Sequence, residues 1–452
     1  MRTVWKAADI LLPAEGVDMA LWPALACDQF TSQPEYWQRA EALCMDVPST
    51  LHITLPEVYL EQRGVAAHIS TIHAAMREYA LGVLTRRMHG FVYTERRFPG
   101  KAQVRCGLVG AVDLEAYSYE KGARALVRPS ENTVVERIPP RLAVRRGALL
   151  ESPHILMLLD DEARSVIEPF AAQKAALTQL YDTDLMLNGG RVAGWAVTDE
   201  AAIKSVENAV ARFGTQEVFD AKYPAAKGAA PLALAVGDGN HSLATAKAYW
   251  EELKATLTAE EQKTHPARLC LVELVNVHSE AIEIEPIHRA VFGTDSETFT
   301  EEFSAWLRAG GADLCVRARP ASDTSGDADF AAGKPCVAAQ GQCFTVVAGS
   351  AQSADHTLCV TNAPHPLAVG TLEQFLPQFC AAHPGTHVDF IHGETAVREL
   401  SQRGAVGILL PDFAKSDVFC GVVLGGVLPR KTFSMGEATE KRYYLECRKI
   451  AL

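Results

Sequence analysis

Hydrophobic and polar residues follow each other along the chain in blocks that predict both helices and strands. Apolar residues at three- and four-residue spacing predict amphipathic helices over 65–84, 163–180, 199–214, 298–309 and 371–382. Apolar and β-branched runs predict strands over 51–60, 88–93, 103–114, 154–159, 195–197, 268–277 and 404–412. Because the two patterns are interleaved, we predict an α/β fold of mixed (α+β) character.

The most informative block is residues 231–257, PLALAVGDGNHSLATAKAYWEELKATL. Its pattern predicts a buried strand over 231–236, a tight turn over 237–242 and a helix over 243–257. A strand that feeds a glycine turn and then a helix points backbone N–H groups and the positive end of the helix dipole at an anion.

The character of the chain changes after Phe292. We predict an α/β core over 1–292, which contains the turn, and a C-terminal α+β region over 293–452. Within the second region, Pro, Gly, Ser and Asp are frequent near 318–336, which predicts an exposed loop.

The net charge, the apolar stretches and the cysteine spacing argue against several classes of protein. The formal net charge of −12 opposes generic nucleic-acid binding. The N-terminus lacks a signal-peptide pattern, and the longest apolar stretch, 418–428, is too short to span a bilayer, so we expect a cytoplasmic protein without a membrane span. The eleven cysteines include no C-x-x-C pair, which favours reduced thiols over a disulfide framework or a zinc site.

The turn offers the strongest candidate chemistry. Gly237 and Gly239 permit close approach of a ligand to the backbone, and Asp238 is a candidate ligand for a metal ion or a hydroxyl group. His241 and Ser242 lie where side chains reach a phosphate. The alternative is a plain strand-to-helix turn in which Asp238 or its neighbour Asn240 caps the helix.

Two further clusters carry charged side chains. Glu283, Glu285, His288 and Arg289 fall within seven residues, where Arg289 is suited to clamp an anion and His288 to move a proton. The alternative is an Arg–Glu ion pair beside a structural histidine. In residues 128–133, Glu131 is a candidate general base, and Arg128 is a candidate anion ligand together with Arg137 and Arg141, which follow closely. A solvated loop explains the same residues. Cys27 and Asp28 form a weaker candidate at the end of an apolar run.

These motifs resemble the bacterial and archaeal family of unknown function numbered 1015, over most of the chain. Residues 237–242 resemble the family pattern A-D-G-H-H-R, and residues 286–289 resemble P-T-H-R. Residues 130–133 resemble H-E-x-T, and residues 429–433 partly match P-x-K-S/T-x-F. The chain departs from the family where Asn240-His241-Ser242 replaces His-His-Arg, and Arg289 or Lys431 would then replace the missing charge.

Around the turn, this family is similar to the nucleotide-binding core of ParB and sulfiredoxin, which includes archaeal kinases of free serine. The resemblance implies a nucleotide phosphate at the turn and phosphoryl transfer to a small hydroxyl compound. A DNA-binding role, also suggested by ParB, is opposed by the negative net charge.

We therefore predict a phosphotransferase that uses ATP or ADP and Mg²⁺ on a small hydroxylated metabolite such as an amino acid. The predicted catalytic residues are Glu131 as base, Asp238 as metal ligand, His241 and His288. The predicted nucleotide-binding residues are Gly237, Gly239, Asn240, Ser242, Arg289 and Lys431. If the three clusters form one site, Glu131, Asp238, His241, His288 and Arg289 are expected in one cleft. The alternative is a regulatory protein that binds a nucleotide or another anion without catalysis.

Overall fold

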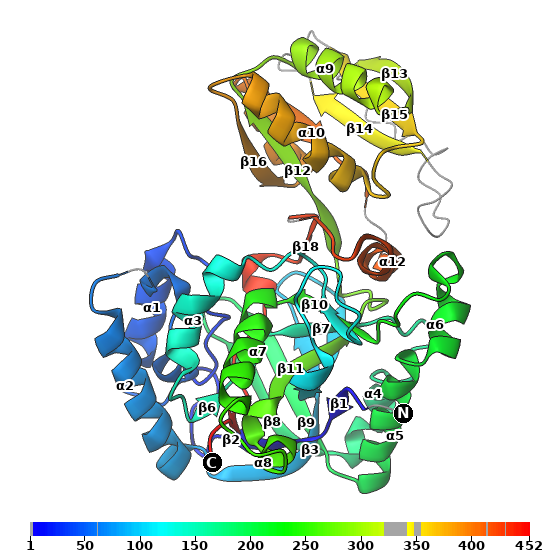
Figure 1. Ribbon diagram of the computed structural model, residues 1–452. Helices are drawn as coiled ribbons and strands as arrows, with labels where there is room; N and C mark the ends of the chain where they lie inside the picture. The colour runs from blue at the N-terminus through cyan, green and yellow to red at the C-terminus, as the bar shows by residue number, and fades with distance from the viewer. Residues whose placement is uncertain (1–2, 61, 321–340, 348–353, 413–414, 430) are drawn as a thin grey trace. The chain divides into compact units, whose positions relative to one another are not determined.

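The computed structural model describes residues 3–60, 62–320, 341–347, 354–412, 415–429 and 431–452. The chain forms two compact units, one of Met1–Ile282 with Gly436–Leu452 and one of Glu283–Met435. Each unit has its own β-sheet (Figure 1).

The sheet of the first unit combines antiparallel and parallel pairs. Its strands are β1 (Trp5–Lys6), β2 (Ala8–Leu12), β3 (Arg86–Arg97), β4 (Val104–Asp113), β5 (Val127–Pro129), β7 (Leu156–Leu159), β8 (Thr178–Leu185), β9 (Gly190–Val197), β10 (Leu234–Asp238) and β11 (Leu269–Asn276). They follow the order β5-β10-β7-β11-β4-β3-β9-β8, with β1 on β4 and β2 on β3. The parallel pairs are β5 with β10 and β7 with β11. This mixed pairing places the carboxyl end of β10 beside the start of β7.

Apolar side chains cover both faces of this sheet. The helices are α1 (Pro34–Cys44), α2 (Val65–Glu78), α3 (Ile138–Arg145), α4 (Pro169–Gln173), α5 (Glu200–Phe213), α6 (Gln216–Lys222), α7 (Asn240–Lys254) and α8 (Glu261–Thr264). Tyr93 of β3 packs in a core cluster with residues of α5 and α7, whereas its neighbour Val92 packs in a second cluster with α1. The alternation of side chains along β3 therefore supplies both cores.

The C-terminal segment, residues 436–452, is built into the first unit. Leu11 and Cys447 exchange backbone hydrogen bonds of 2.8 and 2.9 Å. Strand β19 (Arg448–Lys449) pairs with β6 (Leu150–Glu151). The buried Arg442 donates to Glu273 at 2.7 Å and to Glu446 at 2.6 Å. These contacts fix the last residues of the chain against the sheet that carries the turn.

The second unit contains an antiparallel sheet. Its strands are β12 (Ile284–Phe292), β13 (Asp313–Pro320), β14 (Gln342–Val347), β15 (Ala354–Thr361), β16 (His387–His392), β17 (Val406–Leu409) and β18 (Phe433–Met435). They follow the order β13-β15-β14-β17-β12-β16, with β18 on β12. Its helices are α9 (Ser296–Ala309), α10 (Ala368–Ala382), α11 (Glu394–Gln402) and α12 (Lys415–Gly425). Buried Phe299 and Phe303 of α9 pack against Phe375 of α10 at ring distances of 5.6 and 4.9 Å.

The mixed α/β fold is confirmed, and two predicted elements are wrong. The helix expected over 163–180 shrinks to α4, because the segment from Thr178 onwards pairs with β9 as β8. The strand expected over 51–60 is instead two short 3-10 turns, Thr50–Ile53 and Glu57–Tyr59, on either side of Pro56, which has no N–H for a sheet. The first difference comes from tertiary pairing, whereas the second comes from the local effect of a proline.

Some boundaries also differ from the expected ones. Strand β12 pairs with β16 and β17, so residues 283–292 belong to the second unit, and residues 436–452 belong to the first. Of the loop expected near 318–336, residues 318–320 end β13 and the rest lies outside the described residues. Within the described part of the chain, none of the helices combines the length and apolar character needed to span a membrane.

Candidate functional site

The turn after β10 is held in a backbone conformation that favours glycine. Gly239 has φ +79°, and a Cβ atom there would lie 3.0 Å from Cγ1 and 3.1 Å from Cα of Ile155. The helix begins at Asn240, three residues earlier than the pattern predicts, so His241 and Ser242 lie in its first turn. Close packing against β7 and the left-handed φ together explain why glycine occupies this position.

The start of α7 has no side-chain cap, with Gly239 as the N-cap residue. The N–H groups of Ser242 and Leu243 donate to the Gly239 carbonyl at 3.0 and 3.1 Å. The N–H of Asn240 has no acceptor among the residues that the structure describes. A helix of fifteen residues therefore presents its positive end and an unused amide at this turn.

Two buried side-chain oxygens near the turn also lack a partner. Ser130 follows β5 directly, and its N–H donates to the Val236 carbonyl of β10 at 3.2 Å. The side chain of Ser130 is fully buried, and its Oγ has no hydrogen-bond partner in the described chain. Oδ1 of Asn240 is also buried without a hydrogen-bond partner there. Because buried polar atoms are normally paired, these two atoms have hydrogen-bonding capacity that the described chain does not use.

The turn receives a positive charge from the C-terminal segment. Nζ of Lys441 lies 3.3 Å from Oδ2 of Asp238, and both side chains are largely buried. The other oxygen of Asp238, Oδ1, accepts the N–H of Gly239 at 3.1 Å. Asp238 therefore holds the turn and places Lys441 next to the start of α7.

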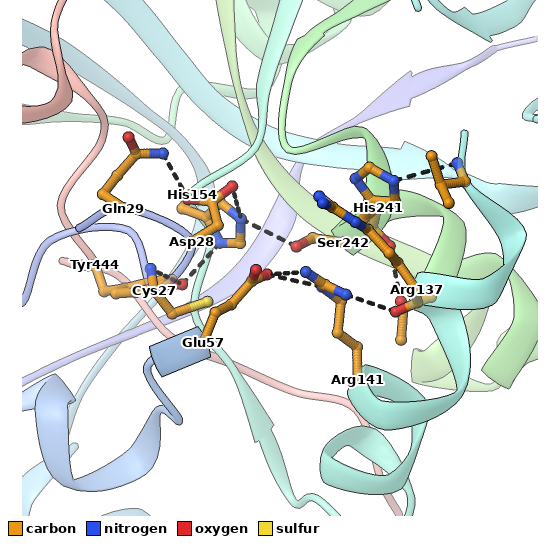
Figure 2. Close-up of polar contacts among 12 residues, drawn as sticks. Cys27, Asp28, Gln29, Glu57, Arg137, Arg141, His154, His241, Ser242 and Tyr444 are labelled. Atoms are coloured by element: carbon orange, nitrogen blue, oxygen red, sulfur yellow. Dashed lines mark hydrogen bonds and ion pairs between the residues drawn. The ribbon is translucent and has the colours of Figure 1, made fainter. Parts of the chain in front are cut away.

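His154 is the centre of a hydrogen-bonded cluster at this helix start (Figure 2). Its Nδ1 lies 2.8 Å from the hydroxyl of Tyr444, and its Nε2 lies 3.0 Å from Oγ of Ser242 and 3.9 Å from Oδ2 of Asp28. Burial raises the pKa of Tyr444 well above its usual value, so this hydroxyl keeps its proton and can donate to Nδ1. Nε2 on the other side of the ring faces both the hydroxyl of Ser242 and the carboxylate of Asp28.

Asp28 is an ionised carboxylate in this cluster. Burial alone would raise its pKa, but attraction to His154, a hydrogen bond from Gln29 and attraction to Lys441 outweigh burial and lower the pKa below the usual value. The side chain of Gln29 donates to Oδ1 at 2.9 Å. A carboxylate held ionised beside an imidazole is suited to accept a proton or to contact a cation.

Glu57 and Arg141 lie beside this carboxylate (Figure 2). Nε of Arg141 donates to Oε1 of Glu57 at 2.8 Å. Burial raises the pKa of Glu57, with Arg141 opposing the shift and Asp28 adding to it. The neighbouring thiol of Cys27 has its pKa raised strongly by burial and by these carboxylates, so it is a poor nucleophile.

The cluster differs from a serine-hydrolase triad. In a triad, the serine and the carboxylate contact opposite nitrogens of the histidine. Here Ser242 and Asp28 both lie at Nε2 of His154, whereas Nδ1 faces Tyr444. The geometry therefore favours a positioned carboxylate over an activated serine.

The structure gathers most of the predicted turn residues in the first unit. Gly237, Asp238, Gly239, Asn240, His241 and Ser242 form the end of β10 and the first turn of α7. Nε2 of His241 accepts the N–H of Val134 at 3.2 Å, which ties the segment after β5 to the helix start. Glu131 is half-buried in that segment. Because Nε2 accepts an N–H, it carries no proton in this arrangement.

His288, Arg289 and Lys431 belong to the second unit. Arg289 is fully buried and donates from Nε to Glu373 at 2.8 Å and from an Nη atom to the Lys431 carbonyl at 3.2 Å. Nδ1 of His288 accepts the N–H of Leu410 at 3.2 Å. The side chain of Lys431 is exposed. These contacts match the structural alternative for this cluster, an ion pair beside a structural histidine.

Several residues of the site were not singled out by the sequence: Glu57, His154, Lys441 and Tyr444. They come from three separate places in the chain, and none belongs to a short motif. Lys441 and Tyr444 follow a segment whose pattern gives no hint that it returns to the first unit. Asp28 had only a weak signal, its place after an apolar run.

The sheets, the helices and the turn define a mixed α/β protein. Residues 11–366 match the family model described as "Protein of unknown function (DUF1015)". This match covers well over half of the sequence, so the chain belongs to that family. The comparison with curated proteins found no match.

The solved structures that are similar to this chain are distant from it. A conserved hypothetical protein from Pyrococcus furiosus is 10% identical, with a TM-score of 0.33, and the match covers 75% of this chain and 94% of that one. A free serine kinase in complex with AMP is 10% identical, with a TM-score of 0.36 and coverage of 78% and 97%. SbnI with a C-terminal truncation, from Staphylococcus aureus, is 10% identical, with a TM-score of 0.31 and coverage of 73% and 83%.

Proposed function

We propose that the protein is a nucleotide-dependent phosphotransferase that holds a phosphate group at the start of α7 and uses a small hydroxylated metabolite as acceptor. The observation that carries this proposal is the uncapped helix start, where an unused amide, the buried hydroxyl of Ser130 without a partner and Lys441 occur in one region. Helix starts of this kind bind phosphate through their amides and dipole. The resemblance of the turn to the nucleotide-binding motif supports ATP or ADP as donor.

The phosphate contacts follow from the groups at the turn. The N–H of Asn240 and the hydroxyl of Ser130 are donors without another acceptor in the described chain. Lys441 adds a positive charge 3.3 Å from Asp238.

The donor set fits Mg²⁺ carried by a nucleotide better than a metal held by the protein alone. Among the described residues, no group of three His, Cys, Asp or Glu side chains could hold a metal ion. Mg²⁺ needs only one or two carboxylates when phosphates and water supply its other ligands. Asp238 is the carboxylate that would contact it, and the bound ion would neutralise charge on the phosphates.

Asp28 is proposed as the general base. As the acceptor oxygen bonds to phosphorus and the bond to the leaving nucleotide breaks, the hydroxyl proton would pass to Asp28. His154 would hold that carboxylate in place, and Tyr444 would fix the orientation of His154. Glu131, the base predicted from the sequence, stays a second proposal for this role because its segment contacts His241 through Val134.

One test separates this proposal from a binding protein without catalysis. The full-length protein is incubated with ATP or ADP, Mg²⁺ and serine, threonine or homoserine, and phosphorylated products are followed by ³¹P NMR. The proposal expects a phosphomonoester that depends on the acceptor. Nucleotide binding by calorimetry without any product would favour the regulatory alternative, for which the replacement of the family's arginine by Ser242 argues. Absence of nucleotide binding would contradict both. We place this activity in the cytoplasm, as the cysteine pattern favours.

A further inference from the structure

Three cysteines form a row across adjacent strands of the second unit. Cys359 of β15 is directly opposite Cys315 of β13 and directly opposite Cys343 of β14. Side chains at directly opposite positions in an antiparallel sheet project to the same face. All three thiols therefore project from one face of the sheet, with Cys359 in the middle.

The spacing of this row suits disulfide chemistry. Sγ of Cys343 lies 3.7 Å from Sγ of Cys359. Opposite residues of antiparallel strands have Cα atoms about 4.5 or 5.5 Å apart, and disulfides accept Cα separations of about 4.4–6.8 Å. Either neighbour of Cys359 is thus within reach after rotation of the side chains.

The three thiols differ in their access to solvent. Cys315 is exposed, whereas Cys343 and Cys359 are half-buried. A dissolved disulfide therefore reaches Cys315 most easily. Among the described residues, no group of three metal-ligating side chains is arranged to hold a metal ion, so the geometry favours redox chemistry over a soft-metal site.

We propose that Cys343 and Cys359 form a reversible cross-strand disulfide, with Cys315 as the thiol through which a low-molecular-weight disulfide enters. The Cys315 thiolate attacks the dissolved disulfide and releases one small thiolate. Cys359 then attacks the sulfur of Cys315 and releases the second small thiolate. Finally Cys343 attacks Cys359 and frees Cys315. Two protein thiols are oxidised and one dissolved disulfide is reduced to two thiols, so atoms and electrons balance.

This redox site is independent of the proposed phosphotransferase chemistry, because none of its residues belongs to the site around α7. Cross-strand disulfides that form and break in a reducing compartment are sensing devices more often than permanent links. The expected product is a second unit whose strands β14 and β15 are covalently joined.

Oxidised glutathione tests the proposal on the full-length, folded protein. After alkylation and digestion, mass spectrometry is expected to find peptides joined through residues 343 and 359, and nine of the eleven thiols should remain. Dithiothreitol should restore all eleven. Cys343→Ser should abolish the link, Cys315→Ser should slow its formation, and Cys380→Ser, on α10, should change neither.

Three outcomes would overturn the proposal. The first is an absence of the joined peptides in the wild-type protein, a result that does not depend on how any variant folds. The second is a stable disulfide between residues 315 and 359, which would show that Cys343 takes no part in the final disulfide. The third is a Cys315→Ser variant that oxidises at the wild-type rate, which would remove the role of Cys315 as the entry thiol.

Discussion

The turn before α7 and the stretch around Arg289 on β12 both carry polar and charged side chains. They differ in whether these polar groups have hydrogen-bond partners in the described chain. At the turn, the amide of Asn240 and the hydroxyl of Ser130 have no partner in the described chain. On β12, the guanidinium of Arg289 is fully buried, paired with Glu373 and stacked 4.4 Å from the centre of the Phe390 ring. Unused hydrogen-bonding capacity, rather than the presence of charged residues, distinguishes a candidate ligand site from a structural ion pair.

This difference has an energetic meaning. A buried ion pair is costly to break, because the remaining partners lose their hydrogen bonds in a place that water reaches poorly. An uncapped helix start is a modest cost that a bound anion can remove. Substitutions on β12 should therefore act on stability, and substitutions at the turn should act on binding and turnover.

The largest effect is expected from Arg289→Met. It would leave the Lys431 and Ile287 carbonyls and the Glu373 carboxylate without their donor, so we expect a loss of about 3–5 kcal/mol in the free energy of unfolding of the second unit. Urea unfolding measures the change. Arg308→Met, at an exposed position of α9, is the control and should stay within about 0.5 kcal/mol of wild type. Intact stability together with lost nucleotide affinity would assign Arg289 to a ligand instead.

Asp28→Asn should give the next largest effect. The amide cannot accept the hydroxyl proton, so we expect kcat to fall about 100-fold while the Kd for nucleotide changes little. Steady-state kinetics and calorimetry separate the two. Asp46→Asn, an exposed substitution after α1, should leave kcat unchanged. If Glu131→Gln lost the activity and Asp28→Asn kept it, the base would be Glu131.

A pair of lysines tests which unit supplies the charge. Lys441→Ala removes the cation beside Asp238 and leaves that carboxylate to repel phosphate, so the Kd for nucleotide should rise about tenfold, or about 1.4 kcal/mol. The exposed Lys431, which the sequence suggested, should tolerate the same change without effect on Kd. If Lys431→Ala raised the Kd and Lys441→Ala did not, the phosphate site would instead include residues 429–433.

His288 gives the smallest effect, and it depends on pH. Burial lowers its pKa below the usual 6.5, with Arg289 adding to the shift and Glu394 opposing it. Below pH 6.5 the unfolded chain therefore binds protons more readily than the folded one, and the free energy of unfolding should fall as the pH drops below 6.5. In His288→Gln the free energy of unfolding should fall less steeply over the same pH range. His387→Gln, at an exposed position, should keep the wild-type slope, and equal slopes for all three proteins would refute this assignment.

Local patterns in the sequence predicted the mixed fold and the strand–turn–helix around Gly239 because neighbouring residues determine both. They could not show that Lys441 and Tyr444 reach the turn, since that depends on how residues 436–452 pack against β2 and β6. Nor could spacing show that Glu373, on α10, neutralises Arg289. The sequence found the turn, whereas the partners that decide its chemistry lie far away in the chain.

A crystal structure of the full-length protein with ADP and Mg²⁺ at saturating concentration tests the central claim most directly. The account predicts a phosphate group within hydrogen-bond distance, about 3 Å, of the Asn240 amide at the start of α7, with Lys441 alongside. A phosphate bound among His288, Arg289 and Lys431 with the α7 turn empty would contradict it, as would the absence of nucleotide from both places.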